Sequence, residues 1–317
     1  MVQRAYDLWH ELEQLSVESL LLTTGGLMIG PPAGEVFPGA KASAEKHRLR
    51  HEVLTAAEVR RRFPALQPGD DQCAILEPRA GILFPERCIA AHLAAARNAG
   101  LQLQVDERVL GWKAEAGGVR VRTSRSDYTA THLLLTAGAW IQSLLPDFQL
   151  PLQVERQVLF WFEAVRNPEW FQRDRCPVHL WETPAGELFY GFPDLGDGVK
   201  LARHHSGLST TADTVDRSVL PADEESIRGC AKKYLPDANG RLRSATVCLY
   251  TNTPDSHFWI DSHPEFPQVL IGSPCSGHGF KFASVMGELL AGEILGEKPI
   301  FDLSLFRRRT GSGSGPS

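Results

Sequence analysis

The sequence predicts a mixed α/β protein built from two domains. Its 317 residues suffice for about two domains at roughly 150 residues each. Segments in which apolar and polar residues alternate, as in half-buried strands, are interspersed with segments in which apolar residues recur every three or four positions, as in amphipathic helices. The sequence contains no repeat of the length that solenoids need. Because strands and helices do not alternate regularly, we expect mixed sheets and not a regular βαβ fold.

The chain begins with an amphipathic helix, because its apolar residues lie on one helical face, at Val2, Ala5, Trp9, Leu12 and Leu15. Glycine and proline then mark where the following elements break or end. Four further elements are expected here: a strand over 20–29 interrupted at Gly25 and Gly26, a helix over 43–62 ended by Pro64, a strand over 81–84, and a helix over 85–99 closed by Gly100.

The rest of the chain is richer in strands. Alternating segments over 101–112 and 119–123, on either side of Gly117 and Gly118, indicate a hairpin. The elements expected after it are a strand over 128–136 whose buried run ends in a turn at 137–140, strands over 154–162 and 188–201, a helix over 224–234, a short strand over 269–271, and a helix over 280–294.

Composition limits the class of protein. Apolar residues make up 43% and charged residues 22% of the chain, which excludes a disordered protein. The net charge of −5 argues against a nucleic-acid binder that relies on a bulk positive field. We expect neither a signal peptide nor a membrane span, and the six irregularly spaced cysteines favour reduced thiols in the cytoplasm. Residues 307–317 are expected to be a flexible tail.

Several common catalytic and metal-binding motifs are absent from the sequence. It contains no H-E-x-x-H, no C-x-x-C, no G-x-x-x-x-G-K-[ST] and no G-x-S-x-G, which disfavours a zinc site, a P-loop and an α/β-hydrolase triad. His204 and His205 are adjacent in a predicted strand, so their side chains should point to opposite faces. We therefore expect no metal site.

Two segments near the C-terminus carry the strongest chemical signal. Residues 248–255 read Cys-Leu-Tyr-Thr-Asn-Thr-Pro-Asp, and residues 276–281 read Ser-Gly-His-Gly-Phe-Lys. The glycines on both sides of His278 let the backbone approach a flat ligand. The helix expected from Phe280, together with Lys281, favours an anionic ring or a carboxylate. On local physics alone, a glycine-rich turn that caps an ordinary helix is an equally good interpretation.

Together these segments resemble the C-terminal signature of the family of monomeric sarcosine oxidase and N-methyl-L-tryptophan oxidase, which are FAD-dependent enzymes of the D-amino-acid-oxidase-like superfamily. Residues 135–140 resemble the family's strand-to-flavin turn, and residues 190–193 and 199–201 resemble its substrate-domain strands. The resemblance implies a two-domain FAD-dependent amine oxidase fold. Its FAD-binding domain would be discontinuous, over 1–20, 85–155 and 245–306, with a substrate-binding domain over 21–84 and 156–244.

The resemblance also implies roles for individual residues. Cys248 matches the cysteine that attaches covalently to the 8α-methyl carbon of FAD, Lys200 the lysine that activates oxygen, and Lys281 a lysine that binds the substrate carboxylate. The other implied positions are Tyr190, His204 and Tyr250 for the substrate, and Val109, Gly138, Trp140, Gly277, His278, Gly279 and Lys281 for the cofactor. The plainer alternatives are a buried inert thiol for Cys248, a surface lysine for Lys200 and a core histidine for His204.

The implied reaction is the oxidation of a secondary amine. An N-methyl amino acid would give an imine that hydrolyses to formaldehyde and the demethylated amino acid, while oxygen becomes hydrogen peroxide. The pocket is not readable from the sequence, so sarcosine, N-methyl-tryptophan and cyclic imino acids such as pipecolate stay open. The expected partners are the small amino acid substrate and oxygen, with neither nucleic acid nor membrane. The protein is expected to be a monomer unless a partner replaces a missing segment.

One departure from the family is large. Its members open with a strand, G-x-G-x-x-G and a helix that hold the FAD pyrophosphate. No such motif precedes Tyr6. We therefore expect an FAD-binding domain without its first βαβ unit and without an arginine-bearing loop that pairs with the substrate carboxylate. The alternative function is a non-redox remnant that binds a small carboxylate or a protein partner.

Overall fold

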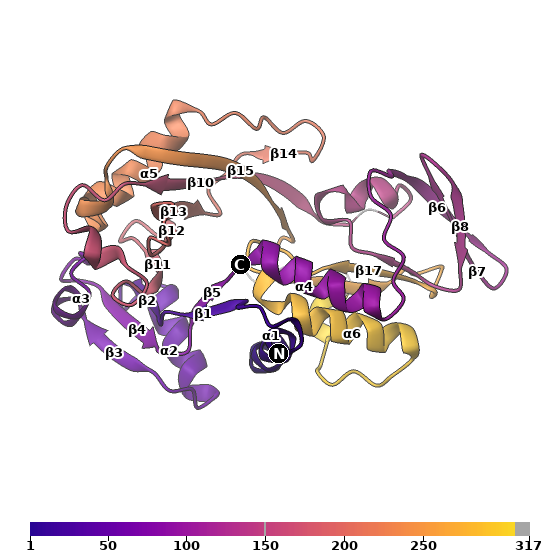
Figure 1. Cartoon of the computed structure of the whole chain (residues 1–317), viewed down its shortest axis with the longest axis horizontal. Helices are drawn as coiled ribbons and strands as arrows, with labels where there is room; N and C mark the ends of the chain where they lie inside the picture. Colours follow the sequence, from indigo (N-terminus) through magenta and orange to yellow (C-terminus); the bar gives the residue numbers. More distant parts are fainter. Residues whose placement is uncertain (149, 308–317) are drawn as a thin grey trace. The chain divides into compact units, whose positions relative to one another are not determined.

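The computed structural model describes residues 1–148 and 150–307, and it confirms the mixed α/β class (Figure 1). The chain divides into two compact units. The first comprises Met1–Leu20, Pro85–Val154 and the chain from Tyr250 onward, and the second comprises Leu21–Phe84 and Glu155–Leu249. Each unit is therefore assembled from separate stretches of sequence. Within the described residues, no helix is both long enough and apolar enough to cross a membrane.

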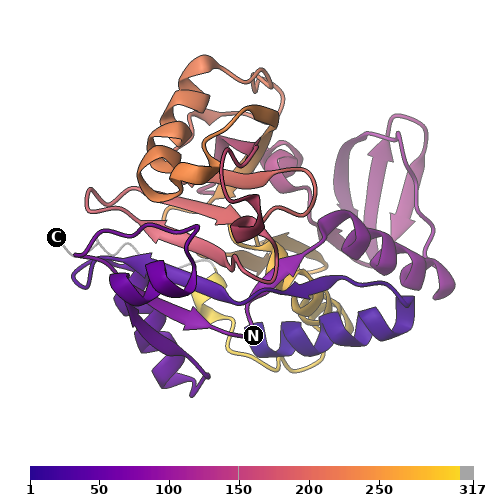
Figure 2. The same ribbon diagram turned by 60° about the vertical axis from the view of Figure 1, so that its left-hand side comes forward.

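The first unit combines α-helices with two small sheets. Its elements are α1 (Val2–Ser16), α4 (Pro85–Asn98), β6 (Val109–Glu115), β7 (Gly118–Thr123), β8 (Asp127–Ala130), β9 (Leu133–Leu135), η1 (Gly138–Leu144), β16 (Trp259–Ser262), β17 (Val269–Ser273), η4 (Phe280–Phe282), α6 (Ala283–Leu295) and η5 (Ser304–Phe306). Strand β17 pairs in parallel with β9 and antiparallel with β16. Strands β6, β7 and β8 form an antiparallel meander, which lies to one side of α1 and α6 in both views (Figures 1 and 2).

Helix α1 is held in the first unit by its apolar face. The Trp9 side chain is 2% exposed. Its ring centroid lies 5.3 Å from that of His92 in α4 and 6.1 Å from that of Phe280 in η4. Ala5 and Leu12 are buried on the same face, whereas Leu15 is 77% exposed, because at about 3.6 residues per turn it lies at the edge of that face. The amphipathic helix expected at the start of the chain is therefore present, with its last apolar position outside the core.

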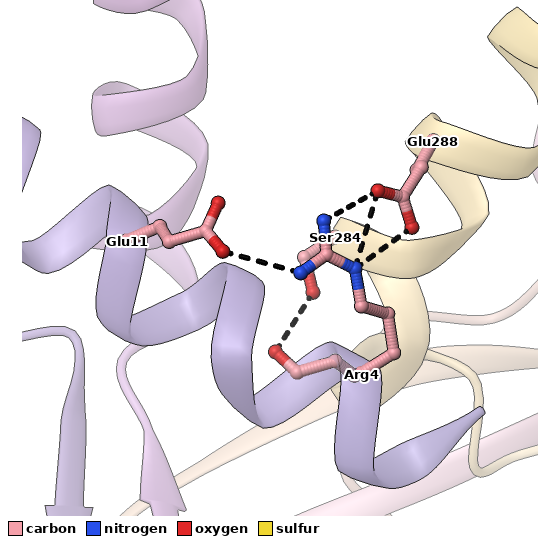
Figure 3. Close-up of polar contacts among 5 residues, drawn as sticks. Arg4, Glu11, Ser284 and Glu288 are labelled. Atoms are coloured by element: carbon pink, nitrogen blue, oxygen red, sulfur yellow. Dashed lines mark hydrogen bonds and ion pairs between the residues drawn. The ribbon is translucent and has the colours of Figure 1, made fainter.

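Polar contacts also join α1 to α6 (Figure 3). Arg4 donates to the Glu288 carboxylate, with an Nη2–Oε1 distance of 2.6 Å, and its other terminal nitrogen lies 3.2 Å from Glu11 Oε1. The Ser284 hydroxyl donates to the Ala5 carbonyl at 3.2 Å. The Arg4 guanidinium lowers the pKa of the Glu288 carboxyl. These contacts fix the start of the chain against the helix that follows the glycine-rich loop.

The second unit is built on a large, mainly antiparallel sheet. Its elements are β1 (Leu21–Thr23), β2 (Gly26–Gly30), α2 (Val36–Lys46), β3 (Glu52–Thr55), α3 (Ala56–Arg62), β4 (Cys73–Glu77), β5 (Gly81–Leu83), β10 (Gln153–Phe162), η2 (Pro168–Phe171), β11 (Val178–Glu182), β12 (Leu188–Phe192), β13 (Val199–His204), β14 (Ser209–Thr210), α5 (Pro221–Tyr234), η3 (Pro236–Ala238) and β15 (Leu242–Asn252). The strand order is β14-β10-β13-β12-β11-β2-β4-β3, with β15 also paired to β10. Strands β1 and β5 form a separate pair.

The two faces of the large sheet differ in burial. One face carries large apolar side chains that pack against α5, and together they form the core: Leu27, Ile29, Phe160, Trp181, Phe189 and Leu201 from the strands with Ile227, Ala231 and Tyr234 from the helix. Helix α5, drawn in orange, lies beside the sheet in Figure 2. The opposite face of β12 and β13 carries half-buried residues in alternation with the buried ones. One face therefore builds the core, and the other is available for function.

A neutral histidine lies in this core. Trp181 Nε1 donates to His179 Nδ1 at 2.7 Å, so the uncharged ring carries its own proton on Nε2. Among the described residues, His179 Nε2 has no hydrogen-bond partner. Gly191 lies directly opposite on β12, and a Cβ at that position would collide with the imidazole. Burial lowers the pKa of His179 to about 3.

We expect the stability of the protein to fall in acid through His179. The unfolded imidazole binds a proton below about pH 6.5, whereas the folded one stays neutral down to about pH 3. The contribution of His179 to the free energy of unfolding is therefore fully present above pH 6.5. It is lost as the pH falls toward 3, by on the order of 1 kcal/mol per pH unit for one proton. Urea unfolding of the wild type and of His179→Gln between pH 4 and pH 7 measures this. Equal pH slopes in the two proteins would contradict the prediction.

The prediction of one helix over 43–62 is wrong. The chain forms α2, then β3, then α3, because β3 pairs with β4 some twenty residues further along the chain. Helix α3 begins at a capping box, in which the Thr55 hydroxyl accepts from the Glu58 N–H and the Glu58 carboxylate accepts from the Thr55 N–H. The spacing Thr-x-x-Glu is a helix-start signal that the sequence did contain.

Helix α2 begins earlier than predicted because a distant residue caps it. The Glu182 carboxylate on β11 accepts from the N–H groups of Glu35 and Val36 at 2.7 and 2.8 Å. These donors have no partner inside the helix, and a carboxylate is the favoured acceptor at a helix N-terminus. Since the cap comes from elsewhere in the chain, the sequence around α2 does not reveal it.

Other element boundaries also differ from the predictions. No strand forms over 101–108, and β6 starts at Val109, because alternation alone does not supply a neighbour for the backbone. The predicted strand over 188–201 is split by a turn in which Asp194 Oδ1 accepts from the N–H groups of Gly196 and Gly198 at 2.7 and 2.9 Å. The predicted strand over 128–136 divides into β8 and β9. The predicted tail over 307–317 lies, after its first residue, outside the described residues.

Candidate functional site

The half-buried face of the large sheet brings three sequence-predicted residues together. Lys200 and His204 are four residues apart on β13, so their side chains lie on the same face of the sheet. Tyr190 on β12 pairs with Ala202, which lies between them on that face. The ring centroids of Tyr190 and His204 are 6.0 Å apart. All three site residues are half-buried, whereas Leu201 on the other face is fully buried.

Two aromatic residues that the sequence analysis did not single out enclose Lys200. Trp161 on β10 and Phe192 on β12 are its direct cross-strand neighbours. The Lys200 ammonium lies 5.0 Å from the Trp161 ring and 4.9 Å from the Phe192 ring, measured to the ring centroid. These are cation–π distances. Finding these residues requires the register of three strands, which no sequence motif supplies.

The two adjacent histidines do not point apart as predicted. The ring centroids of His204 and His205 are 4.2 Å apart. The prediction is wrong because β13 ends at His204 and His205 adopts a left-handed backbone, with φ of 53°. Strand alternation therefore no longer applies at this position. Among the described residues, no group of three His, Cys, Asp or Glu side chains could hold a metal ion.

Cys248 lies on β15, in the same unit as Lys200. It is half-buried, unlike Cys88, Cys176 and Cys230, which are buried. Burial raises the pKa of the Cys248 thiol, and the positive charge of Lys200 opposes that shift. Burial alone raises the pKa of Cys176 to about 12. The positive charge of Lys200 therefore favours the thiolate of Cys248, which is the nucleophilic form.

The glycine-rich loop of the first unit has a constrained backbone. Ser276 and Gly277 both have positive φ, at 46° and 74°. A Cβ at Gly279 would overlap the Pro274 carbonyl, so that position requires glycine. The Ser276 N–H donates to the carbonyl of Thr251 on β15 at 2.9 Å, one residue beyond the predicted site residue Tyr250. The loop is therefore built against the strand that carries Tyr250.

Lys281 follows this loop in η4. Its ammonium donates to the His278 carbonyl at 2.7 Å, and its own carbonyl accepts from Trp9 Nε1 at 3.0 Å. Lys281 as a whole is exposed to solvent. Protein atoms nevertheless surround its ammonium group, and this desolvation lowers its pKa to about 8. The α-helix begins only at Ala283, since residues 280–282 form a 3₁₀ turn. The predicted helix start is thus three residues too early.

The parallel pairing of β9 and β17 gathers further predicted cofactor residues. Because Ile271 pairs with Leu135, both strands end at the same edge of their sheet. Gly138 and Trp140 follow β9, and the glycine-rich loop follows β17. Ligands of such sheets commonly bind at the carboxyl ends of the strands. Val109 is placed elsewhere, at the start of β6 in the meander.

The arrangement offers a distinct chemistry in each unit. The second unit presents a sheet face with a cation between two aromatic rings, a tyrosine, a histidine and a half-buried thiol. The first presents a glycine loop, a lysine and the exposed Trp140 at the end of two parallel strands. A cation with a thiol suits covalent attachment and the stabilisation of negative charge. A glycine loop suits a flat ligand.

Comparison with known proteins places the sequence among flavin enzymes. The model of a family described as FAD dependent oxidoreductase (DAO) matches residues 1–293. The chain is 36% identical to a monomeric sarcosine oxidase of Streptomyces avermitilis, over 98% of this chain and 82% of the relative. It is 37% identical to a monomeric sarcosine oxidase of a Bacillus species, over 96% and 79%. It is 33% identical to an N-methyl-L-tryptophan oxidase of Salmonella heidelberg, over 97% and 82%.

Solved structures of low sequence identity share the fold. NikD, an unusual amino acid oxidase essential for nikkomycin biosynthesis, matches with a TM-score of 0.81 at 20% identity, over 100% of this chain and 84% of NikD. A glycine oxidase from Geobacillus kaustophilus matches with a TM-score of 0.76 at 20% identity, over 97% and 80%.

Proposed function

Because this chain belongs to the FAD-dependent oxidoreductase family, we propose that it oxidises an N-methyl amino acid with oxygen and carries FAD attached covalently to Cys248. The relatives named above are sarcosine and N-methyl-L-tryptophan oxidases. The observation that carries the proposal is the sheet face on which Tyr190, Lys200 and His204 lie together, in the unit that also holds Cys248. We assign the first unit to FAD binding, and the second to substrate binding and to the covalent attachment of FAD through Cys248.

The residues present fit a flavin. Gly279 is required by the turn itself, because a Cβ there would overlap the Pro274 carbonyl, and the two glycines that flank His278 leave the backbone uncovered by side chains, as the close approach of a flat ring needs. The Cys248 thiol is half-buried and has a cation that favours its thiolate. Gly138, Trp140, His278 and Lys281 are the further residues that would hold the cofactor, whereas Val109, at the start of β6, is not grouped with them. FAD, when bound, supplies the acceptor for a hydride equivalent from the amine and passes the electrons to oxygen.

Side chains of this protein would bind the substrate and stabilise the charge that develops on oxygen. Lys281 would bind the substrate carboxylate through its ammonium group. Tyr190, His204 and Tyr250 would shape the pocket around the amine, which must be uncharged to be oxidised. Lys200 would stabilise the negative charge that develops as oxygen is reduced. The balanced outcome is R–NH–CH₃ + O₂ + H₂O → R–NH₂ + HCHO + H₂O₂.

The wider setting follows the same proposal. All six cysteines lie within the described residues and none of them forms a disulfide, which suits the reducing cytoplasm. We propose a monomer that acts on a small molecule; the Streptomyces relative is a monomeric sarcosine oxidase.

Turnover by the full chain tests the proposed function. We expect the purified protein, incubated with FAD, to show a flavin band and to release hydrogen peroxide with sarcosine or N-methyl-L-tryptophan. Formaldehyde should appear in equal amount, because the N-methyl carbon is the oxidised atom. Peroxide without formaldehyde from pipecolate would instead identify a cyclic imino acid oxidase. A colourless protein that releases no peroxide would favour a carboxylate-binding protein without redox activity.

A further inference from the structure

The aromatic surroundings of Lys200 form a distinct structural unit on the sheet face. Strand β13 lies between β10 and β12, and the residues directly opposite Lys200 on both neighbours are aromatic. Directly paired residues project from the same face of a sheet. The ammonium group therefore lies between Trp161 and Phe192, at 5.0 and 4.9 Å from their ring centroids. We call Trp161 and Phe192 the Lys200 clamp.

We propose that the clamp positions the Lys200 ammonium for the reaction of the enzyme with oxygen. This inference rests on the function proposed above. A lysine side chain has four rotatable bonds and ordinarily samples many rotamers. An aromatic ring attracts a cation over its face, and a neutral amine gains no comparable attraction. Rings on both sides thus confine the ammonium group and favour its charged form.

Packing alone does not account for this arrangement. The core lies on the opposite face, where the neighbours Val199 and Leu201 of Lys200 are fully buried. An apolar residue at position 200 would cover the two rings at lower desolvation cost than an ammonium group. The ring of Phe192 is itself braced, since its centroid lies 5.8 Å from that of Tyr190 in an edge-to-face contact. The clamp is therefore joined to the predicted substrate residues.

The first test measures the Lys200 amine and requires no flavin. The full chain is treated briefly with acetic anhydride at pH 8, and acetylation of each lysine is followed by peptide mass spectrometry. In Trp161→Leu, which keeps apolar volume but lacks a ring, we expect Lys200 to react about 3- to 10-fold faster than in the wild type, as expected for loss of one cation–π contact. Trp161→Phe should react within about twofold of the wild type because it keeps a ring.

The same molecule contains an internal control. Lys233 on α5 lies 4.9 Å from the ring centroid of Tyr234 and is remote in sequence from the clamp. Its acetylation rate should not change in any Trp161 variant. Phe192→Leu provides a second variant, so that a folding defect in Trp161→Leu does not decide the result. Unchanged Lys200 reactivity in both leucine variants would overturn the clamp.

The second test links the clamp to the oxygen reaction. In the FAD-loaded full chain, stopped-flow measurement should find the reoxidation rate of Trp161→Leu lowered about tenfold, with the rate of reduction by substrate within about twofold of the wild type. Faster acetylation of Lys200 with unchanged reoxidation would overturn the inference. A separate measurement shows whether Lys200 itself has the proposed oxygen role. If it does not, the Lys200→Met variant will reoxidise at the wild-type rate.

Discussion

Replacing Lys200 by methionine should slow the reaction of the reduced enzyme with oxygen by about 100- to 1000-fold, while reduction by substrate stays within about threefold of the wild type. Methionine is similarly long and unbranched but carries no charge. The reason is electrostatic, since the first electron transferred to oxygen creates an anion, which a nearby cation stabilises. Lys200 is suited to this because its ammonium is held between two rings and not neutralised by them. Stopped-flow traces of the two half-reactions provide the measurement.

A matched substitution separates this effect from a general loss of charge. Lys233→Met removes an exposed lysine that also lies over an aromatic ring, and both of its half-reactions should match the wild type. Equal slowing of reduction and reoxidation in Lys200→Met would argue against the oxygen role.

The positive charge of Lys200 also counteracts the raised pKa of Cys248. Lys200→Met should therefore attach flavin more slowly at pH 8, and raising the pH should restore part of the rate, because more thiolate then forms.

Replacing Cys248 by serine should abolish covalent flavin completely. A serine hydroxyl does not ionise near neutral pH, so the nucleophile required for the thioether is lost. The measurement is the visible spectrum of the acid-precipitated protein after incubation with FAD. The wild-type pellet should stay yellow, and the Cys248→Ser pellet should be colourless.

Cys275→Ser is the control for this experiment. Cys275 is also half-buried, and burial raises the pKa of its thiol, a shift that the Ser273 side chain opposes in place of a lysine. Its serine variant should retain covalent flavin at the wild-type level. Release of all flavin from the wild type in acid, or a yellow Cys248→Ser pellet, would remove Cys248 as the attachment site.

Local sequence patterns predicted part of the fold well. The spacing of apolar residues in the first turns identified α1, and Gly100, with φ of 96°, ends the segment that contains α4. The predictions failed where a distant partner decides the structure. Strand β3 replaced predicted helix because β4 was available to pair with it, and α2 was extended because Glu182 caps it.

The sequence by itself determined the family, the mixed α/β class, and the identity of Cys248, Lys200 and Lys281 as candidate site residues, because these follow from motifs of neighbouring residues. Only the tertiary structure decided what surrounds them. Strand register placed Trp161 and Phe192 on either side of Lys200, and parallel pairing placed Gly138 near the strand edge from which the glycine loop departs. The physical reason is that hydrophobic periodicity and motif chemistry are local properties, whereas cross-strand neighbours depend on backbone hydrogen bonds between segments far apart in the chain.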